Sequence, residues 1–189
     1  MLGRYQHQWR PFRSGSGAVL AVLILAVVAV LAAWLDPEPG QLSGQARVSD
    51  GDSFHLGQER VRLLGIDAPE LAQTCKTARG GDWPCGRVAR DRLSALIRSG
   101  TLACDAEGRD KYRRILATCR VDGRDIARAM VVDGLAVSSD DYWREQQTAR
   151  ARRLGLWQGE FQQPRAWRDR QDDQKSDPWS WIMSFAGWA

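Results

Sequence analysis

Histidine is almost missing from this 189-residue chain, which contains only His7 and His55. His7 precedes a long apolar run, and His55 lies on a short predicted strand. A hydrolytic mechanism that needs paired histidines, or a zinc ion bound by several of them, is therefore excluded for the folded part of the chain. We interpret His55 as a surface residue of its strand.

The chain also lacks internal repeats, a phosphate-cradling glycine-rich loop and a strong overall charge. The net charge is +4, but Arg4, Arg10 and Arg13 precede the apolar run and no acid accompanies them. Setting these three aside leaves 24 of the 27 lysines and arginines against 23 acids. Any binding of anions must therefore come from a local arrangement of charges and not from the overall field.

Charged residues are absent from residues 17–35, which are mostly Val, Leu, Ile and Ala. About 20 such residues cross a bilayer, so this run predicts a transmembrane anchor. Arginines precede it and acids follow it, which places residues 1–16 in the cytoplasm and the remainder in the periplasm or outside the cell. A cleaved signal peptide is the alternative, although its apolar core is usually shorter. Residues 36–44, rich in proline and glycine, predict a linker.

The four cysteines all follow the apolar run, in a predicted compartment where disulfides persist. Cys104 and Cys119 are equidistant from the Lys111-Tyr112 step, so a hairpin that turns there predicts a Cys104–Cys119 disulfide. Cys75 and Cys85 would then close a small loop. A four-cysteine zinc site is the alternative, but zinc knuckles usually space a ligand pair more closely.

The remaining pattern predicts an α+β domain at residues 45–160. Period-two apolar runs predict strands, and apolar residues at helical spacing predict three helices, with Asp125 able to cap the second. The expected strands are at residues 45–49, 53–56, 60–66, 101–104 and 115–121, and the expected helices at 87–98, 125–134 and 141–153. Residues 71–85 are expected to form a loop, and residues 105–114 a charged turn.

Acidic and basic residues flank the third strand, where Arg62, Asp67 and Glu70 follow the Asp50-Gly51-Asp52 turn. Together with Asp110-Lys-Tyr-Arg-Arg114 and Gly155-Leu-Trp157, these motifs resemble the staphylococcal nuclease family over residues 45–157. The resemblance implies a small five-stranded OB-type β-barrel with three helices. It also implies calcium-dependent hydrolysis of phosphodiester bonds in DNA or RNA.

Such a reaction needs an activated water, a neutralised phosphate and a stabilised leaving group. Asp52 and Asp67 are hard oxygen ligands suited to Ca²⁺, with the backbone carbonyl of Ala68 completing the shell and Asp50 supporting it from outside. By resemblance, Glu70 is the general base or orients the water. Two arginines would bind the phosphate, and two neighbours on the hairpin would touch a flanking phosphate. The arginines are Arg62 and Arg114, and the neighbours are Lys111 and Tyr112.

Two departures from the family pattern support a second hypothesis. Arg113 stands where relatives usually carry glycine, and residues 137–141 lack the usual tyrosines, for which Tyr142 or Trp143 could substitute. The alternative is a catalytically impaired module that binds nucleic acid or protein. The aromatic-rich tail, residues 161–189, is expected to be disordered up to Asp177, with an interfacial segment from Trp179 to Trp188. No protein partner is evident.

Overall fold

The computed structural model describes residues 15–35, 41–42, 45–139 and 141–176. The chain divides into two units, Met1–Glu38 and Pro39–Ala189. In the first unit, α1 spans Gly15–Leu35, and the side chains at 15, 16, 18 and 32–35 lie outside the described part. Among the side chains that are described, no helix is long and apolar enough to cross a membrane. The anchor expected at residues 17–35 stays a prediction, as does the placement of the domain outside the cytoplasm.

The second unit is built on a mixed sheet of seven strands in the order β1-β8-β9-β4-β3-β2, with β10 paired to β9. The five expected strands are β2 (Ala46–Val48), β3 (Ser53–Leu56), β4 (Glu59–Leu63), β8 (Leu102–Arg109) and β9 (Ile115–Val121). Two short additions, β1 (Gln41–Leu42) and β10 (Arg124–Asp125), extend it. The β4–β9 pair is parallel and the others are antiparallel. This is the OB-type α+β fold that the resemblance implied.

The third expected strand, residues 60–66, is interrupted. β4 ends at Leu63, Gly65 adopts a φ of 74°, and β5 (Ile66–Asp67) pairs instead with β11 (Val137–Ser138). Glycine adopts this left-handed conformation at little cost, so the chain can turn at Gly65. The turn therefore separates Arg62, on β4, from Asp67, on β5, and from Glu70, which follows β5.

The β8–β9 hairpin places Cys104 opposite Cys119, and the two form a disulfide as predicted. β8 is longer than expected, because residues 105–109 continue the strand and only the tip at residues 110–114 turns. The charges at these positions, which predict a turn, occupy an exposed face of the strand. The second predicted disulfide, Cys75–Cys85, is also present and encloses a small hairpin of β6 (Cys75–Lys76) and β7 (Asp82–Trp83) within the expected loop.

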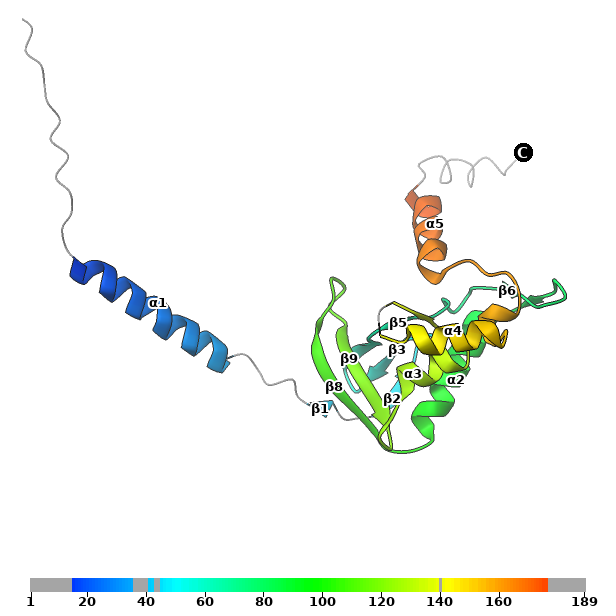
Figure 1. Cartoon of the computed structure of the whole chain (residues 1–189), viewed down its shortest axis with the longest axis horizontal. Helices are drawn as coiled ribbons and strands as arrows, with labels where there is room; N and C mark the ends of the chain where they lie inside the picture. Colours follow the sequence, from blue (N-terminus) through cyan, green and yellow to red (C-terminus); the bar gives the residue numbers. More distant parts are fainter. Residues whose placement is uncertain (1–14, 36–40, 43–44, 140, 177–189) are drawn as a thin grey trace, which may run out of the picture. The chain divides into compact units, whose positions relative to one another are not determined.

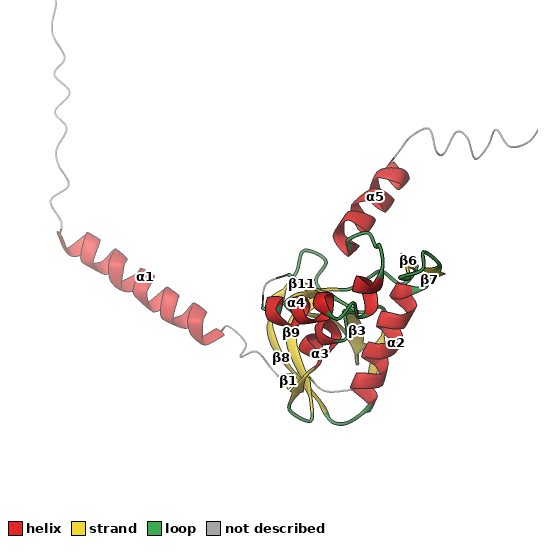
Figure 2. Ribbon diagram, turned by 45° about the vertical axis from the view of Figure 1, so that its right-hand side comes forward, coloured by secondary structure: helices red, strands yellow, loops and turns green. Residues whose placement is uncertain are grey.

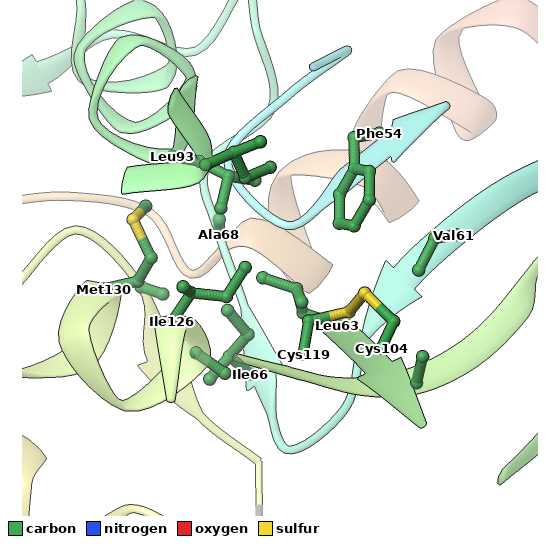
Figure 3. Packing of buried hydrophobic residues seen from close by; sticks show 14 of the residues in the cluster. Phe54, Val61, Leu63, Ile66, Ala68, Leu93, Cys104, Cys119, Ile126 and Met130 are labelled. Carbon is green, nitrogen blue, oxygen red and sulfur yellow. A yellow bond between two sulfur atoms is a disulfide. The ribbon is translucent and has the colours of Figure 1, made fainter. Parts of the chain in front are cut away.

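Three helices pack around the sheet: α2 (Cys85–Arg98), α3 (Ile126–Val132) and α4 (Trp143–Ala151). The Asp125 side chain caps α3 by accepting the Arg128 N–H, as predicted. Leu93 of α2 and Met130 of α3 are fully buried against strand residues such as Leu63. Figure 3 shows these side chains with the Cys104–Cys119 disulfide in one continuous interior. A short 3₁₀ helix, η1 (Gly155–Gln158), follows α4.

The segment after η1 differs from the prediction of disorder up to Asp177. It forms a helix, α5 (Pro164–Ser176), which begins with proline at the first helical position, where the missing N–H costs nothing. Pro164 itself is fully buried. Figures 1 and 2 show α5 projecting from the body of the domain. The interfacial segment expected from Trp179 to Trp188 lies outside the described residues.

Candidate active site

Asp52 is the most deeply placed acid of the site, with a residue exposure of 3%. The preceding turn is held by Asp50, whose Oδ1 accepts the Asp52 and Ser53 N–H groups and the Ser53 hydroxyl. The Asp52 carboxylate accepts the Ala68 N–H at 3.1 Å. Burial raises the pKa of Asp52 from 3.8 to about 8, and the opposing charge of Arg62 does not offset it. The ionised form of Asp52 is therefore disfavoured, because the Arg62 guanidinium does not compensate for its burial.

Arg62 joins the two predicted metal-binding acids. Its Nη1 donates to Asp52 at 3.0 Å and its Nη2 to Asp67 at 2.9 Å. Burial lowers the pKa of Arg62, but the Asp52 and Asp67 carboxylates outweigh that effect and raise it. Because one planar guanidinium serves both carboxylates, the two acids converge on a common point.

Glu70 is positioned by its backbone. Its carbonyl accepts the N–H of Gln73 at 2.8 Å, and the start of α2 passes close against the same carbonyl. A Cβ at Gly86 would overlap the Glu70 carbonyl oxygen, so only glycine allows this approach. The Glu70 side chain remains partly exposed and directed toward the cleft that contains Arg62 and Asp67.

The hairpin tip keeps the conformation that glycine would favour. Arg113 adopts a φ of 63°, and its N–H donates to the Asp110 carbonyl at 2.9 Å. Arg114 is fixed by Asp110, whose Oδ2 accepts Nε at 2.8 Å and Nη2 at 2.7 Å. Burial alone would raise the pKa of Asp110, but the backbone and guanidinium of Arg114 lower it. The substitution at 113 is therefore accommodated, and Asp110 is a positioning residue that the sequence motif contained without revealing its role.

A cleft of about 770 Å³ brings these groups together. It is lined by Asp50, Arg62, Asp67, Glu70, Lys111, Tyr112 and Arg114. Asp52 and Ala68 are buried behind this lining and are joined by a hydrogen bond. Lys111 Nζ and the Arg114 guanidinium lie 5.0 Å and 5.5 Å from the Tyr112 ring centre, so the hairpin tip carries cations and an exposed aromatic face. The strand-borne half and the hairpin half of the predicted site thus face one opening.

Arg168 of α5 also reaches the site, and no sequence motif points to it. Its Nη1 donates to Glu70 at 2.8 Å, and its Nη2 donates to both oxygens of Asp67 at 2.9 and 3.0 Å. Burial lowers the pKa of Arg168, but the two carboxylates raise it above its ordinary value. A contact across about 100 residues has no local signature.

The donor set suits a hard cation, although its oxygens face arginines in this structure. Within the described part of the chain, no three acidic, histidine or cysteine side chains gather as a metal site. Asp52 and Asp67 nevertheless converge on the two Nη atoms of one guanidinium. Oxygen ligands of this type fit Ca²⁺.

The OB-type sheet and a cleft lined by acids and phosphate-compatible arginines define a hydrolase of the nuclease class. Residues 60–159 match the family described as staphylococcal nuclease homologue, and the chain belongs to that family. Over 151 residues it is 39% identical to the succinoglycan biosynthesis protein ExoI of Rhizobium meliloti, covering 76% of this chain and 75% of the relative. It is 28% identical to protein ParB of Escherichia coli, covering 88% of each. It is 29% identical to the SPbeta prophage-derived endonuclease YokF of Bacillus subtilis, covering 59% of this chain and 42% of that protein.

Proposed function

We propose that the protein is a calcium-dependent nuclease that hydrolyses phosphodiester bonds of DNA or RNA. The observation that carries the proposal is the convergence of Asp52 and Asp67 on one guanidinium, beside Glu70 and across the cleft from Arg114. Several relatives are named endonucleases, which supports the same substrate class.

Each side chain has a physical role in this proposal. Asp52, Asp67 and the carbonyl of Ala68 would hold Ca²⁺, which when bound supplies positive charge for a phosphate oxygen. Glu70 accepts the proton of the attacking water, and Arg114, held by Asp110, donates to the developing negative charge. When a bound cation neutralises Asp52 and Asp67, Arg62 would provide a second planar donor to the phosphate.

The conformation of the hairpin tip weakens the alternative of a catalytically impaired binding module. Arg113 adopts the left-handed backbone itself, so Arg114 keeps its two contacts with Asp110. The absence of tyrosines at residues 137–141 concerns base stacking and leaves the charged groups of the cleft in place. Tyr112, with an exposed ring at the cleft, offers another stacking surface.

A cleavage assay tests the proposal. The full-length chain, purified in mild detergent, is incubated with end-labelled single-stranded DNA and RNA, in calcium or in excess chelator. We expect cleavage in calcium only, and a loss of about 100-fold or more for Arg62→Ala, which removes a donor to the phosphate. The matched control is Arg47→Ala, an exposed arginine on β2 that does not line the cleft. Binding without cleavage under every divalent ion would favour the impaired module.

We propose in addition that residues 17–35 anchor the domain in a membrane, on the basis of their length and lack of charge. Alkaline extraction of membranes should leave the chain in the pellet. Protease added from outside intact cells or spheroplasts should degrade the domain. Release of the chain by alkali would contradict the anchor. Protection of the domain from the protease would contradict its orientation.

A further inference from the structure

We propose that α5 is a lid that closes the active site in the metal-free protein, with Arg168 competing with the cation for Asp67 and covering Glu70. The inference deepens the proposed function and rests on it. It begins from the contacts of Arg168, which takes up both carboxylate oxygens of Asp67 and one of Glu70.

These contacts oppose the binding of a cation at Asp67. Calcium requires carboxylate oxygens at about 2.3 to 2.6 Å, and Asp67 Oδ1 already accepts from Arg62 and Arg168 while Oδ2 accepts from Arg168. One side chain thus contacts both a predicted metal ligand and the predicted proton acceptor. A cation at Asp67 would stand beside the Arg168 guanidinium, and the repulsion between the two positive charges favours displacement of Arg168.

The rest of the α5 face that lines the cleft favours exclusion of substrate over binding. Arg165, Arg168, Asp169 and Asp172 line it at spacings of three and four residues, which is one face of the helix. Asp169 and Asp172 would repel a nucleic-acid backbone in the same cleft. If Arg168 were simply a third ligand of the phosphate, two acids on the same helix face would oppose it.

The helix is attached in a way that permits opening. Its base is fixed, since the buried Gln73 side chain donates to the Gln162 carbonyl at 2.7 Å and Pro164 is fully buried. Beyond Pro164 most residues of α5 are exposed, and Arg168 forms ion pairs with Asp67 and Glu70 in the body of the domain. Two guanidiniums share Asp67 Oδ1 in the closed form, and their repulsion limits its stability.

Calcium affinity measures the competition without depending on cleavage. Calorimetric titration of the full-length chain with Ca²⁺ at low salt compares wild type with Arg168→Ala and Arg168→Lys. When the closed form is about ten times more populated than the open form, the apparent affinity for Ca²⁺ is about tenfold weaker. We therefore expect the Kd to fall about tenfold in Arg168→Ala and by less in Arg168→Lys, which keeps the charge and loses the paired donors. Arg170→Ala is the matched control, because it removes the same charge from an exposed position of α5 that does not line the cleft.

Hydrogen exchange of α5 separates failure of the lid from failure of the proposed function. In metal-free protein, amides of residues 168–173 should exchange faster in Arg168→Ala than in wild type, and calcium should raise the wild-type rate toward the variant's. Equal exchange in the two metal-free proteins, or unchanged or weaker calcium binding in Arg168→Ala, would overturn the lid. A loss of cleavage by Arg168→Ala at saturating calcium would overturn it in favour of a phosphate ligand. Absence of calcium binding by wild type and variant alike would refute the proposed calcium dependence together with the competition.

Discussion

Replacing Asp52 with asparagine should change the pH dependence of stability in a way that reveals the buried charge. The pKa of Asp52 is raised from 3.8 to about 8, chiefly by burial. Between these two values the folded state binds more protons at this position than the unfolded state does. The free energy of unfolding of the metal-free protein therefore falls as pH rises from about 4 to 8.

The magnitude follows from the width of that interval. At pH 7 the interval is about three pH units, each worth about 1.4 kcal/mol, so ionisation of Asp52 costs about 4 kcal/mol of stability. Asparagine removes this cost but replaces one acceptor by a donor near the Ala68 N–H and Arg62, which costs about 1 to 3 kcal/mol. The variant should be less stable than wild type near pH 4 and more stable near pH 7.

Urea denaturation from pH 4 to 8, in chelator and with both disulfides intact, measures the effect. Wild type should lose about 5 kcal/mol more than Asp52→Asn over this range. Asp105→Asn is the control, since Asp105 is an exposed acid paired with Arg120 on the hairpin, and its curve should run parallel to wild type. Parallel curves for Asp52→Asn as well would refute the reasoning, because the buried carboxylate would then be ionised without cost.

Three further substitutions test particular elements. Cys104→Ser with Cys119→Ser opens a loop of 15 residues and should lower the free energy of unfolding by about 3 kcal/mol in urea, whereas an unchanged midpoint would show that the disulfide does not constrain the unfolded chain. Arg113→Gly should raise thermal stability by about 0.5 to 1 kcal/mol, because the left-handed backbone costs arginine more than glycine's added entropy, and a lowered Tm would contradict the strain. Gly86→Ala places a Cβ against the Glu70 carbonyl, so kcat should fall about 10- to 100-fold at similar KM, and an unchanged kcat would show that this approach does not position Glu70.

Local patterns were sufficient for most of the fold and for half of the site. The equal spacing of Cys104 and Cys119 from the hairpin tip predicted both the register and the disulfide. The strand expected at residues 60–66 was wrong in its last part, because Leu64 and Ile66 are apolar in either conformation and the turn depends on Gly65 alone. The turn predicted at residues 105–109 is wrong, because exposed strand positions and turns share the same polar composition.

The rest of the site depends on contacts that composition cannot reveal. Arg168 lies in a segment where charges of both signs cancel, and its position becomes meaningful only when Gln162 and Pro164 are fixed against the core. Asp110 belonged to a recognised motif, but its role in holding Arg114 required the geometry of the tip. The predicted roles of Asp52, Asp67 and Glu70 gain a common location in the cleft wall and stay predictions of chemistry.

The most direct measurement of the central claim is the rate of phosphodiester cleavage by Glu70→Gln relative to wild type, in saturating calcium. Glutamine retains the shape of Glu70 but cannot accept the proton of the attacking water. The account predicts a loss of about 100-fold or more, with calcium affinity retained, and no loss for Glu107→Gln, an exposed acid on β8. Equal rates for Glu70→Gln and wild type would contradict the assignment of this cleft as the catalytic site.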